Sequence, residues 1–200
     1  MVMKRDRIVL TAKTIATHKE VIDLYNSNPN LPRGYKLKDS DPWCAAFVSA
    51  VFIKNGYYDI AECSCPQMIE RAKKLGIWIE SDKYHPVVGD VIMYDWQDSG
   101  SGDNTGVADH TGIVINTTDT YFIVREGNKA GAVGNRTLIY DGKFIRGFIN
   151  PKYEKAAKNY KTVDDIVNAI ISGDFGNGEN RKQLLYNYFQ QKVNKKLGGK

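Results

Sequence analysis

The spacing of apolar residues changes once along this chain, near Pro86, and that change limits the fold more than any other feature. Before Pro86 the apolar residues recur at helical spacing, and after it they gather in short runs typical of strands. The predicted helices are 4–26, the helix that begins near Cys44, and 66–75, and the predicted strands are 90–94, 111–115, 121–124, 136–140 and 143–149. Asp141-Gly142 between the last two strands predicts a tight hairpin turn. Helices followed by an antiparallel meander predict an α+β domain with helices on one face of the sheet.

Cys44 lies at the start of the most apolar of these helices. Asp41 is a suitable N-cap residue and Pro42 suits the first helical position, which puts Cys44 in the first turn. Free N–H groups and the positive end of the helix dipole favour a thiolate there. Alternatively, Cys44 is an ordinary small core residue, as most unpaired cysteines are.

One predicted hairpin carries residues suited to activate this cysteine. If the turn between strands 111–115 and 121–124 is centred on Thr118, paired residue numbers sum to 236, so His110 faces Glu126. Their Cβ atoms would then be roughly 5 Å apart. Asn128 would share their face, because side chains alternate along a strand. We therefore expect Cys44 to act as nucleophile, with His110 as its base and Glu126 as the group that orients the base.

The composition is typical of a globular protein, and the N-terminal sequence does not predict export. The 200 residues are 42% hydrophobic and 26% charged, and no apolar run approaches the ~20 residues of a membrane span. The apolar segment Ile8–Ala12 is too short for a signal peptide, so we expect the protein to stay in the cytoplasm where it is made until it is released. Three cysteines do not indicate a disulfide framework, and Cys63 and Cys65 lack a second pair at zinc-site spacing. We expect Cys65 and Pro66 to open helix 66–75.

The net positive charge of the chain comes from its C-terminal fifty residues. Residues 1–150 contain 18 basic and 18 acidic side chains, whereas residues 151–200 contain 10 and 5. A basic segment can contact nucleic acid, an anionic membrane or an anionic wall polymer, or it can be a solvated helix face. Without a nucleic-acid motif, we expect no nucleic-acid partner and no stable membrane association.

The C-terminal part reads as a separate helical unit. We predict a catalytic domain over 1–151, a lysine-rich linker over 152–161, and a small helical unit over 162–200. In that unit an amphipathic helix begins near Val163 and ends at Gly173, and a second helix spans 181–197. Fewer than 40 residues rarely fold alone, so we expect this unit to dock on the domain, to self-associate or to be marginally stable.

Four separated motifs resemble the CHAP family of cysteine, histidine-dependent amidohydrolases/peptidases, in particular phage and prophage endolysins. They are Trp43-Cys-Ala-Ala-Phe47, Gly89-Asp90, Asp109-His-Thr-Gly-Ile-Val114 and Glu126-Gly-Asn128. The resemblance covers about 4–151 and implies a papain-like fold. It implies that Cys44 is the nucleophile, His110 the base and Glu126 the orienting acid, with Asn128 supporting the imidazole or the oxyanion. The substrate would be bacterial peptidoglycan.

The resemblance leaves the cleaved bond open. It could join N-acetylmuramic acid to L-alanine, or lie in the stem peptide or a cross-bridge of a Gram-positive wall. Trp43, Trp96 and Asp109 are the expected substrate-binding residues. The same resemblance implies that the protein is located in the cytoplasm of the host bacterium and acts on the cell wall after release.

Some members of this family bind calcium through acidic residues near the nucleophile. Here Ala46 stands where such a carboxylate is expected. Asp39, Asp41 and the Asp-, Ser- and Gly-rich loop 95–109 nevertheless offer oxygen ligands. We expect no cofactor and no bound metal, with calcium as the alternative, and we interpret the loop as a polar border of the cleft.

The C-terminal unit resembles the short cell-wall-binding repeat of phage lysins, through residues 170–178, Arg181 and Val193-Asn194. That likeness implies muropeptide recognition by Asp174, Phe175, Asn177 and Arg181. A simple helix connector is the alternative reading of the glycine-rich loop. For the whole chain, two other functions stay open: a catalytically silent wall-binding phage component, and a papain-like acyltransferase or deamidase.

Overall fold

The computed structural model describes residues 3–98, 106–153 and 162–171, together with separate positions between 182 and 196. The chain divides into two units, residues 1–154 and 155–200, which are described separately. In the described residues, no helix is both long and apolar enough to cross a membrane.

The N-terminal segment forms two helices, so the prediction of one helix over 4–26 is wrong. Helix α1 spans Arg5–Thr14 and α2 spans His18–Asn26. The chain turns between them because Thr17 Oγ1 accepts the Glu20 N–H at 3.2 Å, while the Glu20 carboxylate accepts the Ala16 N–H at 3.4 Å. Thr17 and Glu20 have the spacing of a capping box, a signal that the sequence does contain.

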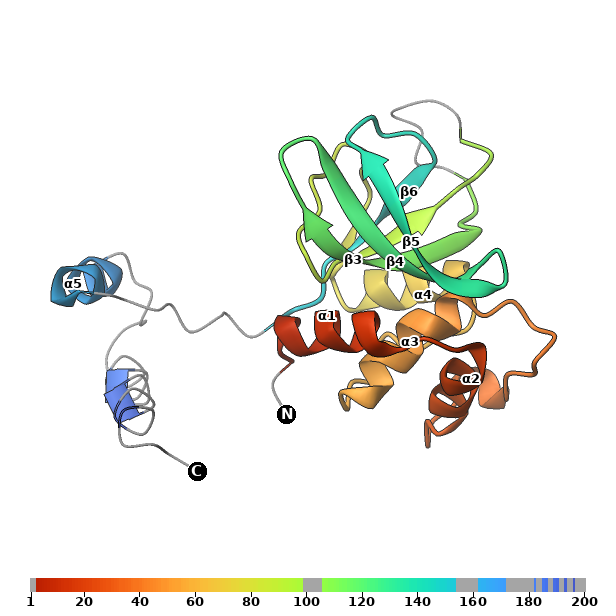
Figure 1. Ribbon diagram of the computed structural model, residues 1–200, viewed down its shortest axis with the longest axis horizontal. Helices are drawn as coiled ribbons and strands as arrows, with labels where there is room; N and C mark the ends of the chain where they lie inside the picture. Colours follow the sequence, from red (N-terminus) through yellow and green to blue (C-terminus); the bar gives the residue numbers. More distant parts are fainter. Residues whose placement is uncertain are drawn as a thin grey trace. The chain divides into compact units, whose positions relative to one another are not determined.

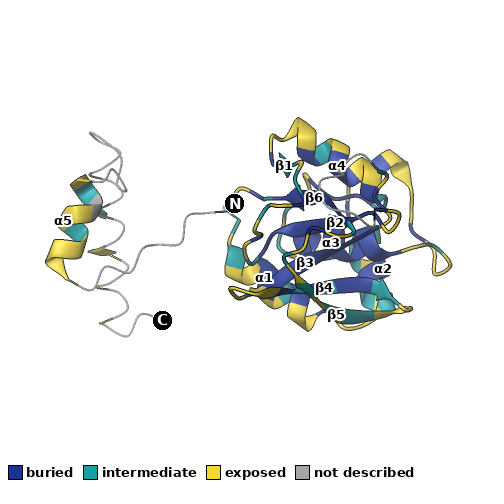
Figure 2. Cartoon of the chain, turned by 90° about the horizontal axis from the view of Figure 1, so that it is seen from above, coloured by how far each residue is buried: buried dark blue, intermediate teal, exposed yellow. Residues whose placement is uncertain are grey.

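Helix α3 is the centre of the domain. It spans Cys44–Lys54, and every residue from Cys44 to Ile53 is buried. It packs against α1, α2 and two strands of the sheet, and Figure 2 shows it among the buried elements. Asp41 is not its N-cap, as predicted, because the Asp41 carboxylate instead accepts the Lys38 N–H and the Tyr35 hydroxyl, both at 2.8 Å. Cys44 is nevertheless in the first turn, and α4 over Cys65–Lys74 agrees with the predicted helix within one residue.

The described strands form one antiparallel sheet in the order β1-β6-β2-β3-β4-β5. Their bounds are β1 Trp78–Ile79, β2 Val91–Tyr94, β3 His110–Thr117, β4 Tyr121–Lys129, β5 Ala132–Ile139 and β6 Ile145–Ile149. In Figure 1 helices α1, α3 and α4 lie below the sheet. The α+β prediction is confirmed, including the meander from β2 to β5; the strand β1 was not predicted.

The predicted hairpin at Asp141-Gly142 is wrong. Strand β6 pairs with β2 and β1 instead of β5. All five residues of β6 are buried, whereas β5 alternates between exposed and half-buried residues as an edge strand. A fully buried strand is more stable between two neighbours than beside an exposed edge. The tight turn lies at Ala130-Gly131, where both φ angles are positive, 51° and 79°, as a type I′ turn requires.

In the second unit, helix α5 spans Val163–Ile171 and confirms the predicted amphipathic helix. Thr162 and Asp165 cap it reciprocally, through Asp165 N–H to Thr162 Oγ1 at 3.1 Å and Thr162 N–H to Asp165 Oδ2 at 3.0 Å. The described positions between 182 and 196 are helical, in agreement with the second predicted helix. The domain boundaries read from the sequence remain a prediction.

Candidate active site

Helix α3 and strand β3 begin at the same place in the domain, and each begins with a candidate catalytic residue. Cys44 is the first residue of α3, and no side chain caps this helix end. His110 is the first residue of β3 and pairs with Tyr94 of β2. Both side chains are buried, with residue exposures of 7% for Cys44 and 9% for His110. The imidazole and the thiol interact by hydrogen bonding and by charge.

Glu126 meets His110, although not through the predicted register. The Glu126 Oε2 atom lies 3.1 Å from Nε2 of His110. Val114 pairs with Val124 and Ile113 with Arg125, so paired numbers sum to 238 here and the value of 236 is wrong. Glu126 is therefore the diagonal neighbour of His110 on the same face, a distance that long side chains can bridge.

The turn chemistry explains the error in register. The Thr118 N–H donates to the Tyr121 carbonyl at 2.9 Å, and the Tyr121 N–H donates to Thr118 Oγ1 at 3.0 Å. The turn is thus centred after Thr118, between Asp119 and Thr120. A bulge at Ile115 then shifts the pairing by one residue.

Two residues outside the expected catalytic and substrate-binding sets hold the Glu126 carboxylate. Arg136 of β5 donates from Nε to Oε1 at 2.7 Å and from Nη2 to Oε2 at 3.0 Å. The Tyr94 hydroxyl donates to Oε1 at 2.8 Å. Glu126 is completely buried, so these donors compensate its charge where water cannot. Pairing across the Ala130-Gly131 turn would have placed Arg136 diagonally opposite Glu126.

These contacts change the protonation of the site. A hydrogen bond from Cys65 is the main cause that lowers the pKa of Cys44 to about 5; burial opposes it, and His110 adds a further hydrogen bond and positive charge. Burial alone would lower the pKa of His110, but Cys44 and Glu126 together raise it to about 9. Burial opposes the charge of Glu126 too, yet its hydrogen bonds from His110, Arg136 and Tyr94 hold the pKa of this carboxyl below its usual value.

At neutral pH the site is therefore a chain of alternating charges. Cys44 is a thiolate, His110 an imidazolium, Glu126 a carboxylate and Arg136 a guanidinium, so the net charge is zero. Buried charges are tolerated when they are paired and hydrogen-bonded in this way. Nε2 of His110 is engaged by Glu126, which leaves Nδ1 to exchange a proton with Cys44.

A glycine allows the two halves of the site to approach. A Cβ atom added to Gly127 would lie 2.3 Å from Cβ of Phe47 in α3 and 2.9 Å from the Trp43 ring. Such contacts do not occur in real structures, so only glycine lets the first turn of α3 pack directly on β4 beside Glu126.

The expected substrate-binding residues occupy different environments. Trp96 is 38% exposed, and its ring stacks on that of Tyr94 with the ring centroids 4.7 Å apart. Its centroid lies 5.9 Å from that of His110, and the Asp109 carboxylate accepts the backbone N–H of Trp96 at 3.0 Å. Trp43, in contrast, is 4% exposed and stacks on His18. Trp96 thus borders the site, whereas Trp43 supports it from inside the core.

Asn128 lies at the bulge between Glu126 and Lys129, with a φ angle of 55°. The bulge interrupts the two-residue alternation on which its predicted orientation rested. Of the polar loop 95–109, positions 99–105 fall outside the described residues, as do Asp174, Phe175, Asn177 and Arg181 of the expected wall-binding set. In the part of the chain that is described, no group of three or more His, Cys, Asp or Glu side chains could hold a metal ion.

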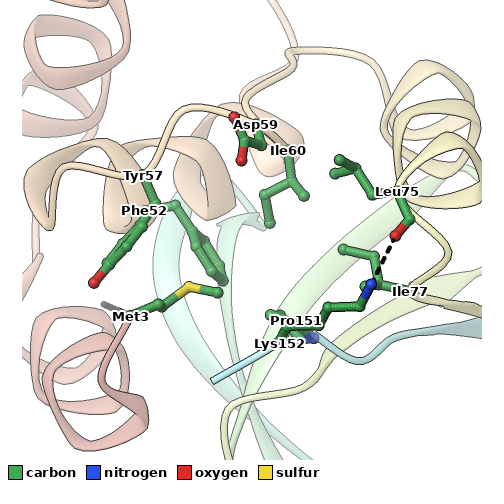
Figure 3. A pocket seen from close by; sticks show the side chains of 9 residues that line it. All are labelled: Met3, Phe52, Tyr57, Asp59, Ile60, Leu75, Ile77, Pro151 and Lys152. Atoms are coloured by element: carbon green, nitrogen blue, oxygen red, sulfur yellow. Dashed lines mark hydrogen bonds between the residues drawn. The ribbon is translucent and has the colours of Figure 1, made fainter. Parts of the chain in front are cut away.

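A pocket of about 390 Å³ lies elsewhere on the domain. Figure 3 shows its mainly apolar lining, with the Lys152 ammonium donating to the Leu75 carbonyl at 3.4 Å. Its lining does not include Cys44, His110 or Glu126; it consists of Met3, Phe52, Tyr57, Asp59, Ile60, Leu75, Ile77, Pro151 and Lys152. This pocket is therefore separate from the candidate catalytic residues.

Comparison with protein families agrees with the geometry. Residues 36–128 match the model of the CHAP domain, a range that includes Cys44, His110 and Glu126. The chain contains a CHAP domain. Residues 164–197 match the CW_7 repeat. Comparison with curated proteins and with solved structures gave no match.

Together, the CHAP domain and the CW_7 repeat indicate a hydrolase-type function on peptidoglycan and binding to the cell wall. The CHAP match ends at residue 128, so Arg136 lies beyond it. The expected wall-binding residues, from Asp174 to Arg181, fall inside the match to the repeat.

Proposed function

We propose that this protein cleaves an amide bond of Gram-positive peptidoglycan through a thiol mechanism, as an N-acetylmuramoyl-L-alanine amidase or as a stem or cross-bridge endopeptidase. The observation that carries the proposal is the buried series of Cys44, His110 and Glu126, in which Glu126 lies 3.1 Å from the imidazole. A nucleophile, a base and a group that orients the base are the parts of covalent acyl transfer. The CHAP domain supports peptidoglycan as the substrate class.

In the first step the Cys44 thiolate attacks the amide carbonyl carbon, and the carbonyl oxygen gains negative charge. First-turn N–H groups of α3 lie beside the sulfur, where they can donate to this oxyanion. His110 then gives its proton to the leaving amine, which departs and leaves a thioester on Cys44. In the second step His110 takes a proton from water, the hydroxide attacks the thioester, and the thiolate leaves.

Glu126 and Arg136 fit this cycle because they keep the charge balanced. While the thioester exists, Cys44 and neutral His110 carry no charge, and Glu126 and Arg136 still cancel one another. Arg136 also competes with His110 for the negative charge of Glu126. We infer that this competition keeps His110 acidic enough to release its proton to the amine.

The two modules divide the task. Trp96 offers an exposed aromatic face beside His110, suited to a sugar ring or a peptide stem. The CW_7 repeat would hold the enzyme at the wall, and its basic surroundings suit an anionic polymer. An endolysin, which acts on the wall from within after release, is the biological role that we propose.

The test is the chemistry of the products. Purified Gram-positive walls and a defined stem peptide are digested, and new chain ends are identified by mass spectrometry. We expect the addition of one water per cleaved bond, with a new amine and a new carboxyl group, and the position of the new ends distinguishes amidase from endopeptidase. Wall binding with an unchanged muropeptide profile would instead support a silent binding component, and addition of an amine would support an acyltransferase.

A further inference from the structure

A second thiol faces the candidate nucleophile. The Sγ atoms of Cys44 and Cys65 lie 3.8 Å apart, although 21 positions separate the residues in the sequence. Both side chains are buried, and both cysteines are unpaired. The hydrogen bond from Cys65 lowers the pKa of Cys44, but the proposed hydrolysis uses only the Cys44 sulfur as nucleophile and leaves the thiol chemistry of Cys65 itself unused.

The helices place both sulfurs at the same kind of position. Cys44 is the first residue of α3 and Cys65 the first residue of α4, and no side chain caps either helix. The N–H group of a first helical residue has no partner within its own helix, so each of these residues is held by fewer helical hydrogen bonds than a residue in the helix interior. A disulfide requires a sulfur separation of about 2.05 Å, an approach of about 1.8 Å from the observed distance.

The surroundings give the two sulfurs different protonation. The hydrogen bond from Cys65 and the neighbouring His110 stabilise the thiolate of Cys44. The hydrogen bond between Cys65 and Cys44 is in turn the main cause that raises the pKa of Cys65, followed by burial and by the negative charges of Cys44 and Asp109. The pair is thus one thiolate beside one retained thiol. Cys63 belongs to another cluster, where it contacts Arg33 and Glu62.

We propose that Cys65 is a resolving cysteine, which converts peroxide-oxidised Cys44 into a reversible Cys44–Cys65 disulfide. The Cys44 thiolate attacks hydrogen peroxide, an S–O bond forms, the O–O bond breaks, and hydroxide leaves. Cys44 is thereby oxidised to a sulfenic acid and the peroxide is reduced. The Cys65 sulfur then attacks the Cys44 sulfur, the S–O bond breaks, and the oxygen leaves as water with the Cys65 proton. The proton of His110 neutralises the hydroxide, so one peroxide and two thiols give one disulfide and two waters.

This reaction would switch the enzyme off and protect it. The disulfide blocks the nucleophile, and a thiol reductant restores it by exchange. Without Cys65, continued oxidation carries Cys44 to the sulfinic and sulfonic acids, which such reductants do not reverse. The loss of activity rests on the proposed function, whereas formation of the disulfide depends only on the geometry of the two sulfurs.

The experiment compares the wild-type protein with Cys65→Ser, Cys65→Ala and the control Cys63→Ser. Each is treated with hydrogen peroxide and then with dithiothreitol, and intact mass, peptide map and wall hydrolysis are measured at each stage. Circular dichroism and thermal unfolding establish that each variant is folded before treatment.

For the wild type and Cys63→Ser we expect a mass loss of about 2 Da, a linked peptide pair containing Cys44 and Cys65, and recovery of most activity in dithiothreitol. For the Cys65 variants we expect two or three added oxygens at Cys44, as the sulfinic or sulfonic acid, and no recovery. Wild-type protein that accumulates oxygen at Cys44 without a linked pair would overturn the proposal, and so would a Cys65 variant that recovers as fully as the wild type. A linked pair in a protein without hydrolase activity would refute the proposed function and leave the redox pair intact.

Discussion

Replacement of Arg136 by methionine separates the electrostatic role of this residue from its packing. The variant loses the guanidinium that binds both Glu126 oxygens but keeps an unbranched stem near the Trp96 ring. In the wild type, Nη2 of Arg136 and Nε2 of His110 lie 3.0 and 3.1 Å from the same Glu126 oxygen. The two nitrogens are therefore at most about 6 Å apart.

The expected shift follows from that distance. Two positive charges about 6 Å apart repel by about 2.8 kcal/mol at an effective dielectric constant of about 20. The Arg136 side chain is 32% exposed, so we reduce this value by about half for solvent screening. The remaining ~1.4 kcal/mol corresponds to about one pH unit. Loss of the repulsion favours the imidazolium, so the pKa of His110 rises further above its wild-type value of about 9.

The assay is the pH dependence of kcat/KM for wall hydrolysis, measured from the acidic to the alkaline limb. In Arg136→Met the alkaline limb should move upward by about one pH unit, and kcat at neutral pH should fall by up to about tenfold, because neutral His110 becomes scarcer for the second step. Arg136→Lys keeps the charge, so its limb should stay near that of the wild type. Arg125→Met, which removes a guanidinium bound to Asn135 and the Ile15 carbonyl, is the matched control. A folded Arg136→Met protein with the wild-type alkaline limb would refute the reasoning.

Three further predictions follow from the same geometry. In the wild type, kcat/KM should rise through about pH 5, as Cys44 becomes a thiolate, and fall through about pH 9, as His110 loses its proton. A pH profile with a single ionisation near the ordinary thiol pKa would contradict the ion pair of Cys44 and His110. Gly127→Ala should displace α3, which lowers the free energy of unfolding by about 1–3 kcal/mol and reduces kcat. Denaturant unfolding measures the change in stability, with the edge-strand variant Gly134→Ala as control. A loss of stability no larger than that of Gly134→Ala would argue against the close approach of α3 and β4. Tyr94→Phe removes one hydrogen-bond donor from the buried carboxylate of Glu126 and should lower the free energy of unfolding by about 1.5–3 kcal/mol at pH 7. An unchanged denaturation midpoint would show that this hydrogen bond does not contribute to stability.

Local signals predicted much of the fold and part of the site. The apolar helix at Cys44 and the strands β2 to β5 were predicted because each shows its own periodicity. The place of β6 was not predicted, because the choice between β5 and β2 as its neighbour depends on burial across the whole sheet.

The site shows the same division between local and non-local information. His110 and Glu126 were expected together and do meet, but a bulge and the true position of the turn make them diagonal neighbours. Arg136 was missed because the turn that pairs β4 with β5 was not recognised. Cys65 approaches Cys44 only through the packing of α4 near α3, which no short-range pattern encodes.

The central claim is that the Cys44 sulfur attacks the amide bond, and one measurement tests it most directly. The rate at which new amino groups appear in purified Gram-positive walls is compared for the wild type, Cys44→Ala and Cys63→Ala, each established as folded by circular dichroism. The account predicts that Cys44→Ala falls to the background rate, whereas Cys63→Ala stays near the wild-type rate. Release of amino groups by Cys44→Ala at the wild-type rate would contradict it.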